Sequence, residues 1–115
     1  MVTSEPYVPD RGDIVWVELT PPSGPEQAGR GPALVFSPKE YNRTVGLAFM
    51  CPISIHVKGY PFEVPLPTKE TVRGVVLADH IKSLDWRIRN VRFLCRVPVD
   101  VIRDTVRKFQ TLLVG

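Results

Sequence analysis

Residues 14–20 alternate between the two faces of an extended chain. Positions 15, 17 and 19 are all apolar, which predicts a strand with one face in the core. Ile14 and Trp16 fall on the other face and are apolar as well. We therefore expect a strand over Ile14–Thr20 whose second face is also partly covered.

Further apolar runs, separated by Gly, Pro and other turn residues, predict five more strands: Ala33–Phe36, Gly46–Ile53, Phe62–Leu66, Gly74–Ile81 and Asn90–Val97. Pro52 has no backbone N–H group, so an edge, a bulge or the end of a strand is expected there. The last run alternates without a break. This predicts an apolar face at positions 91, 93, 95 and 97 and an outer face made basic by Arg92 and Arg96.

One clear helix follows. Apolar residues recur at steps of three and four and form a single stripe: Val99, Ile102, Val106, Phe109 and Leu113. Pro98 suits the helix start, and Asp104 and Lys108 have the spacing of an ion pair. Residues 39–43 predict one more helical turn. Many short strands with one helix predict a mainly β fold, either a small antiparallel barrel or a sandwich.

The length of 115 residues predicts one domain, residues 1–115, with room for one core. No apolar run approaches the ~20 residues of a membrane span, and no secretory signal is visible. We therefore expect a cytoplasmic protein. Cys51 and Cys95 lie in apolar runs, which favours buried thiols and leaves a disulfide open. No His/Cys cluster has the spacing of metal ligands, so no metal site is expected.

The positive charge is concentrated near the C-terminal end. Residues 80–108 hold eight Lys and Arg against three Asp, a net +5, whereas the rest of the chain carries −2. A basic segment indicates a polyanionic partner, either nucleic acid or an acidic peptide. The alternative is a solvated face of the protein.

Gly and Pro mark residues 23–33 as a loop between two predicted strands. Glu26, Gln27 and Arg30 bring a carboxylate, an amide and a guanidinium together there. Loops held by a rigid scaffold often present chemistry. An ordinary hairpin loop with solvated charges is the alternative.

An ordered set of short motifs runs along nearly the whole chain. It consists of Tyr7-Val8-Pro9-Asp10, Gly12-Asp13, Trp16-Val17, Glu26-Gln27-Ala28-Gly29, Pro32-Ala33, Ser37-Pro38, Tyr41-Asn42, Lys58-Gly59-Tyr60-Pro61-Phe62-Glu63-Val64, Leu77-Ala78-Asp79, Lys82-Ser83 and Trp86-Arg87. This set resembles the MazF/PemK/Kid toxins of bacterial toxin–antitoxin pairs, and most closely the MazF branch.

The resemblance implies an SH3-like antiparallel barrel with a C-terminal helix, working as a homodimer. It implies a sequence-specific endoribonuclease that cuts single-stranded RNA without a metal or other cofactor. The substrate's 2′-hydroxyl attacks the adjacent phosphate and leaves a 2′,3′-cyclic phosphate and a 5′-hydroxyl. A cognate antitoxin with an acidic, disordered tail is the implied partner.

Such a reaction needs a proton acceptor, a proton donor and a group that stabilises the charged phosphorane. Arg30 is the candidate for the last role, because a guanidinium fork matches phosphate oxygens. The family places its arginine directly before the proline, where this chain has Gly31. In a strand, a shift by one residue reverses the side chain; in a flexible loop, Arg30 still reaches the site. The alternative is that Arg30 binds substrate and another group does the chemistry.

Three more residues are catalytic candidates. Ser54 stands at the family's threonine position and keeps a hydroxyl that can donate to phosphate, although a strand-end serine also commonly bonds its own loop. Glu26 is a candidate base or RNA-positioning group. His80 replaces the glutamine commonest after Asp79 in the MazF branch, and an imidazole can act as acid or base near neutral pH.

The residues expected to contact RNA are Gln27, His56, Lys58, Tyr60, Asp79, Lys82 and Arg87. Trp16 is expected in the core or at a dimer contact. Two other functions stay open: a gyrase poison similar to the CcdB toxins, which share the barrel, and a decayed toxin that binds RNA and antitoxin without cutting.

Overall fold

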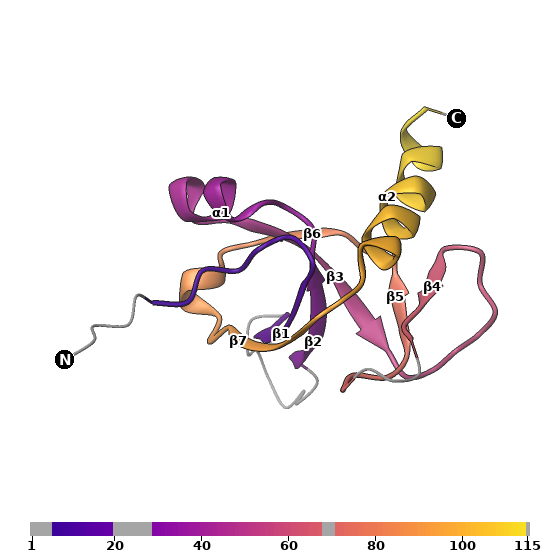
Figure 1. Ribbon diagram of the computed structural model, residues 1–115, viewed down its shortest axis with the longest axis horizontal. Coiled ribbons are helices and arrows are strands. Elements are labelled where there is room, and N and C mark those ends of the chain that lie inside the picture. Colours follow the sequence, from indigo (N-terminus) through magenta and orange to yellow (C-terminus); the bar gives the residue numbers. More distant parts are fainter. Residues whose placement is uncertain (1–5, 20–28, 68–70, 115) are drawn as a thin grey trace.

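The computed structural model describes residues 6–19, 29–67 and 71–114. The strands in these ranges are β1 (Asp13–Glu18), β2 (Arg30–Val35), β3 (Ala48–Ser54), β4 (Glu63–Pro65), β5 (Val75–Leu77), β6 (Lys82–Leu84) and β7 (Arg92–Arg96). The helices are α1 (Lys39–Val45), the short 3-10 turn η1 (Trp86–Ile88) and α2 (Val99–Leu113) (Figure 1). The predicted mainly β fold with a C-terminal helix is confirmed.

All strand pairs are antiparallel, and the sheet follows the open order β4-β5-β3-β2-β1-β7, with β6 paired to β3 as well. β3 is the central strand. Its first half pairs with β6 and its last residues pair with β5. Pro52 stands between these two partners, where a residue without an N–H group interrupts no ladder hydrogen bond on that side.

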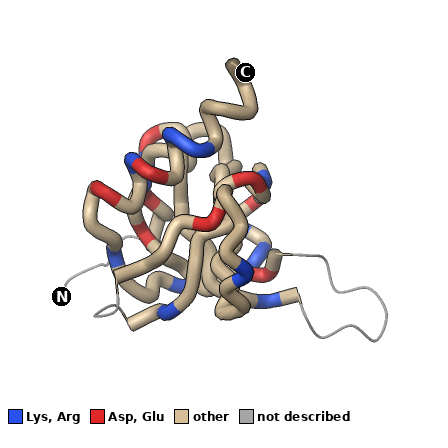
Figure 2. The backbone as a smooth tube through the Cα atoms, turned by 90° about the vertical axis from the view of Figure 1, so that its right-hand side faces the viewer, with Lys and Arg blue, Asp and Glu red and all other residues tan. Residues whose placement is uncertain are grey.

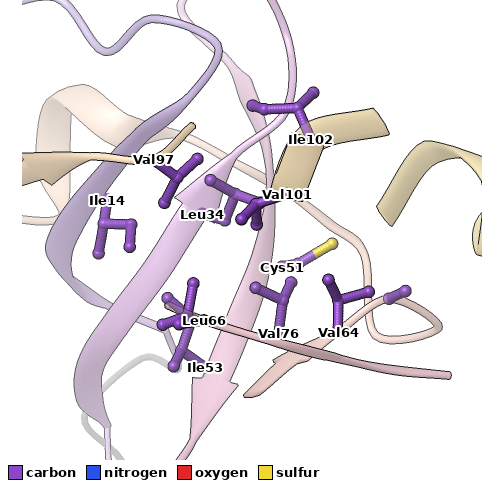
Figure 3. Packing of buried hydrophobic residues seen from close by; sticks show 11 residues of the cluster. Ile14, Leu34, Cys51, Ile53, Val64, Leu66, Val76, Val97, Val101 and Ile102 are labelled. Carbon is purple, nitrogen blue, oxygen red and sulfur yellow. The ribbon is translucent and has the colours of Figure 1, made fainter. Parts of the chain in front are cut away.

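The sheet buries apolar side chains on both faces. One core lies between the sheet and α2 and includes Ile14, Leu34, Cys51 and Ile102 (Figure 3). A second core on the opposite face includes Val15, Val17, Met50 and Trp86. Ile14 and Val15 are both fully buried, so the expected cover on both faces of β1 is confirmed.

The alternation predicted for residues 90–97 is wrong after its first residues. Ile14 pairs with Cys95 and the next residue, Val15, pairs with Phe93, so Leu94 is an extra residue in β7. Such a β-bulge shifts the side chains that follow it. Leu94 consequently packs against the first core, whereas Phe93 is 45% exposed and stacks edge-on against Tyr7.

The apolar stripe predicted for the C-terminal helix is confirmed in its middle, where Ile102 and Val106 pack against the first core and Phe109 contacts Phe36, but not at its two ends. The buried residues of α2 are Val101, Ile102 and Thr105, whereas Val99 and Leu113 are exposed. Thr105 tolerates burial because its hydroxyl donates to the carbonyl oxygen of Val101, 2.8 Å away. The expected Asp104–Lys108 ion pair is replaced as well. Asp104 pairs with Arg107, and Lys108 Nζ donates to the carbonyl oxygen of Glu63.

Several elements differ from the sequence predictions. β2 begins at Arg30 rather than Ala33, because cross-strand pairing with β1 extends to Glu18. β5 ends at Leu77, so Asp79 and His80 lie in a turn. Residues 82–84, which the sequence did not assign to a strand, form β6. α1 extends two residues beyond the predicted turn and ends at Val45; the next residue, Gly46, has a positive φ of 82° that suits glycine.

Within the ranges the structure describes, no helix combines the length and the apolar character that crossing a membrane requires. Cys51 is buried in the first core and carries a free thiol. Burial raises the pKa of this thiol to about 12, so Cys51 acts as a small apolar core residue.

Candidate functional site

Five of the residues predicted from the sequence meet in one open groove of roughly 220 Å³. We call it the Ser54 groove, and its lining residues are Ser54, His56, Lys58, Tyr60, Glu63, Leu77 and His80. They come from the end of β3, the loop that follows it, the β4–β5 pair and the turn after β5. The groove therefore depends on the pairing of β3 with β5, whose partners are more than 20 residues apart in the sequence, and on the pairing of β4 with β5.

Ser54 is the last residue of β3. Its Oγ accepts a hydrogen bond from the backbone N–H of His56, 3.0 Å away. This is the loop-stabilising bond expected of a strand-end serine. An accepting hydroxyl still has its own hydrogen to donate, so Ser54 makes a structural bond and keeps a donor available in the groove.

Glu63 holds the loop that carries Lys58 and Tyr60, and the sequence analysis did not single it out. Its buried carboxylate accepts the backbone N–H groups of Lys58, Gly59 and Tyr60 at 3.0–3.2 Å. A charged acceptor for three backbone donors gives a rigid loop. The exposed side chains of Lys58 and Tyr60 thus project from a fixed backbone. A glutamate between two apolar residues in a short strand was the available signal.

Asp79 and His80 lie in a turn beside the groove, fixed by a hydrogen bond from the His80 N–H to the Leu77 carbonyl oxygen. Asp79 Oδ1 lies 3.7 Å from His80 Nε2. The negative charge of Asp79, together with a hydrogen bond to it, raises the pKa of Tyr60 above its ordinary value. Asp79 is therefore a charged group shared by Tyr60 and His80.

Arg30 lies in a different groove, of roughly 250 Å³. We call it the Trp16 groove, and it is lined by Trp16, Glu18, Arg30, Asn90 and Arg92. Arg30 Nη2 lies 3.4 Å from Glu18 Oε2, and the same carboxylate oxygen accepts a hydrogen bond of 2.6 Å from Asn90 Nδ2. Trp16 is 36% exposed and the Arg30 side chain 64% exposed, so this groove presents an indole face beside guanidinium groups.

Strand register explains the separation of the two grooves. Ala33 pairs with Pro52, so Gly31 and Ser54, two residues away on each strand, share one face of the sheet. Arg30 pairs with Glu18 and lies on the opposite face. Gly31, at the family's arginine position, is therefore the β2 residue on the Ser54 side. The catalytic role of Arg30 stays a prediction.

Most of the Lys and Arg side chains in the basic segment, residues 80–108, bind partners within the chain. Arg96 pairs with Asp13 at 2.6 Å, Arg89 donates to the carbonyl oxygen of Glu18, and Arg87 donates to that of Arg43. Figure 2 shows Lys and Arg at several separate places rather than on one stripe. Lys82 in β6 and Arg87 in η1 are exposed and line neither groove.

Two predicted site residues, Glu26 and Gln27, lie outside the described residues. Residues 6–19, 29–67 and 71–114 contain no group of three or more His, Cys, Asp or Glu side chains that could hold a metal ion. The donors of the Ser54 groove instead suit an anionic ligand with hydrogen-bonding edges: an ammonium, a hydroxyl, a phenol and two imidazoles.

Comparison with known proteins gives concordant matches. Residues 10–113 match the family model described as a PemK-like, MazF-like toxin of type II toxin–antitoxin systems. The chain is 51% identical over 83 residues to the endoribonuclease toxin MazF of Escherichia coli K12, covering 72% of this chain and 74% of that protein. It is 33% identical over 109 residues to the endoribonuclease toxin ChpB of the same organism, covering 90% and 93%.

Solved structures agree. The crystal structure of MazF from Deinococcus radiodurans has a TM-score of 0.87 at 51% identity, covering 96% of this chain and all of that one. A MazE–MazF structure from the same organism has a TM-score of 0.84 at 47% identity, covering 95% and 98%.

Proposed function

The chain belongs to the PemK-like, MazF-like family of toxins of type II toxin–antitoxin systems, and on that premise we propose that it cuts single-stranded RNA in the Ser54 groove. Its relatives are endoribonuclease toxins. The activity is that of a MazF-like endoribonuclease, and the cell compartment is the cytoplasm, where messenger RNA is translated.

The observation that carries this proposal is the convergence of Ser54, Lys58, Tyr60 and His80 on one groove. An ammonium attracts a phosphodiester, a hydroxyl donates to its oxygens, and exposed aromatic rings stack on unpaired bases. Single-stranded RNA offers both chemistries at once. His56 adds a second ring at the same groove.

The proposed reaction is a transesterification within the RNA. The 2′-oxygen attacks the adjacent phosphorus, the bond to the 5′-oxygen breaks, and the products are a 2′,3′-cyclic phosphate and a 5′-hydroxyl. This reaction requires proton transfer and stabilisation of negative charge, and side chains can supply both. We propose that it proceeds without a divalent metal ion.

The proposed partners are a cognate antitoxin and a second copy of the chain. MazF of Deinococcus radiodurans has been solved together with MazE, which supports a cognate antitoxin for this chain. Its acidic tail is proposed to compete with RNA for the groove. Exposed apolar side chains, including Phe49 and Ile88, support a homodimer. The apolar residues of β1 other than Trp16 do not, because the protomer buries them itself.

Replacing a single ribonucleotide of the substrate by its 2′-deoxy form tests the proposed reaction. We expect purified protein to cut a short RNA in the presence of EDTA and to leave a cyclic phosphate, identified by the mass of the fragments. A matched RNA with one 2′-deoxy residue 5′ of the cut bond should stay intact, because it lacks the nucleophile. Cleavage of the deoxy substrate, or cleavage that returns only with Mg²⁺, would show that the mechanism is wrong.

The same assay separates the alternatives. Gly31 in place of the family's arginine favours, as the second candidate, a protein that binds RNA and antitoxin without cutting. Tight RNA binding with no cleavage in any buffer would support it. Inhibition of DNA gyrase without RNA cleavage would instead support a CcdB-like poison.

A further inference from the structure

Asp79 and His80 are a carboxylate and an imidazole next to each other in the chain, and His80 lines the Ser54 groove. An imidazole can take up and release a proton near neutral pH. On the premise of RNA cleavage in the Ser54 groove, we propose that His80, oriented by Asp79, is the general base that activates the 2′-hydroxyl.

The first support is an unsatisfied acceptor. Asp79 Oδ1 is buried and has no hydrogen-bond partner within the residues that the structure describes. A buried carboxylate oxygen without a donor is costly, so a donor is expected to reach it. His80 Nε2 lies 3.7 Å away on a side chain that is 54% exposed and free to rotate. A small rotation of the ring completes the bond.

That bond fixes the ring chemistry. With a hydrogen on Nε2 donated to Asp79, Nδ1 of the neutral ring is left as an acceptor. His80 lines the same groove as Ser54, so this acceptor belongs to the site where a phosphodiester would bind. Asp79 also stabilises the imidazolium that forms when Nδ1 takes a proton, the role of an orienting carboxylate in catalytic triads.

The second support is the composition of the groove. Because of the strand register, Arg30 lies on the face opposite Ser54, and Gly31 is the β2 residue on the Ser54 face. Lys58 supplies positive charge toward the phosphate, and Ser54 supplies a neutral donor. Of the remaining lining groups, Tyr60 has its pKa raised by the negative charge of Asp79, which disfavours the phenolate, and the Glu63 carboxylate is occupied by three backbone donors. His56 and His80 are left as acceptors, and His80 is the one with a carboxylate beside it.

The step balances without a co-reactant other than water. The 2′-hydroxyl proton moves to His80 Nδ1, the 2′-oxygen forms a bond to phosphorus, and the bond between phosphorus and the 5′-oxygen breaks. The leaving 5′-oxygen takes a proton from water. The resulting hydroxide accepts the proton from the imidazolium, which restores neutral His80.

Single-turnover cleavage with His80→Gln, Asp79→Asn and the double variant tests the pair. His80→Gln should lower the rate by ~10²–10⁴, the range for general acid–base catalysis. Asp79→Asn should cost less, and the double variant should be no slower than His80→Gln, because residues acting as one unit are not additive. If the rate losses of the two single variants multiplied in the double variant, Asp79 would act independently of His80, and the proposal that the two residues act as a pair would be overturned.

A substrate with a sulfur leaving group shows whether His80 removes the 2′-hydroxyl proton or protonates the leaving group. An RNA with sulfur in place of the 5′-bridging oxygen at the cut site has a leaving group that needs no proton. The defect of His80→Gln should persist on this substrate if His80 is the base. Recovery to the wild-type rate would make His80 the acid and overturn the assignment.

Controls separate this inference from the proposed function. Asp104→Asn removes a carboxylate from the exposed face of α2 and should leave the rate unchanged. His56→Gln should weaken RNA binding more than it slows bound RNA. Thermal unfolding and RNA binding show whether each variant is folded. If the wild-type protein does not cut RNA, the proposed function fails; if it cuts and His80→Gln cuts equally fast, this inference alone fails.

Discussion

The Ser54 groove and the Trp16 groove divide between them the groups that an RNA-cutting site needs. The first holds the hydroxyl, the ammonium and the imidazoles, whereas the second holds two arginines beside an indole. Their nearest strand residues, Ser54 in β3 and Arg30 in β2, lie at the same end of two strands that are neighbours in the sheet. The two grooves differ because these residues lie on opposite faces.

The difference shows how strongly a shift by one position along a strand changes where a side chain lies. Side chains alternate between faces, so moving an arginine by a single position moves its guanidinium through the sheet. The Ser54 groove is therefore suited to proton transfer. The Trp16 groove is suited to holding RNA, because Arg30 and Arg92 can attract phosphate and its partly exposed indole can stack on a base; Glu18 offsets part of the charge of Arg30 alone.

Among the changes that compare the two grooves, the largest effect is expected at Ser54. Ser54→Ala removes the hydroxyl donor of the Ser54 groove and should slow single-turnover cleavage by about 10²-fold, the lower end for loss of one preorganised donor. Ser54→Thr is the matched control and should keep most of the activity. Equal rates for Ser54→Ala and wild type would show that the groove does not hold the reacting phosphate.

The second prediction restores the guanidinium to the Ser54 face. Exchanging the two residues, with Arg30→Gly and Gly31→Arg together, should raise the cleavage rate by about ten-fold, because a charged donor then adds to Ser54. A Cβ at Gly31 would meet Leu19 Cδ1 at 3.7 Å, an ordinary contact, so the first atom of a side chain is accepted there without a clash. The single change Arg30→Gly is the control. A slower exchanged protein with normal thermal unfolding would contradict the assignment of faces.

The element pattern was largely predictable from the sequence, because alternation and turn residues are local signals. Two features were not local. Gly31 and Pro32 made residues 30–32 look like loop, yet pairing with Trp16 and Glu18 extends β2 over them. The bulge at Leu94 depends on how β7 pairs with β1, and the local sequence gives only a weak sign of it, a leucine on the face that is otherwise basic.

The site was predictable as a set of residues but not as a geometry. Ser54, Lys58, Tyr60 and His80 were expected in the site, and they do meet in one groove. Which face Arg30 occupies depends on where strand pairing begins. The support that Glu63 gives to its loop depends on backbone N–H directions, which no sequence pattern records.

The smallest change is expected at Arg30, and it separates the two roles considered for this residue. In the Trp16 groove, Arg30→Ala removes one phosphate contact. RNA binding should weaken several-fold, and the slope of log Kd against log salt should fall by about 0.7, the value for one contact to a single strand. Cleavage of fully bound RNA should keep its rate, because the guanidinium lies on the face opposite Ser54.

Arg92→Ala is the matched variant of the Arg30 test, since Arg92 lines the same groove from β7 and should lower the same slope. The measurements are fluorescence binding to a 2′-deoxy RNA across a salt series and single-turnover cleavage at saturating protein. A loss of ~10²–10³ in the cleavage rate of bound RNA, as for a missing charge-stabilising donor, would contradict the separation of the grooves. Arg30 would then reach the phosphate at Ser54 through movement of the first residues of β2, as a flexible loop would allow.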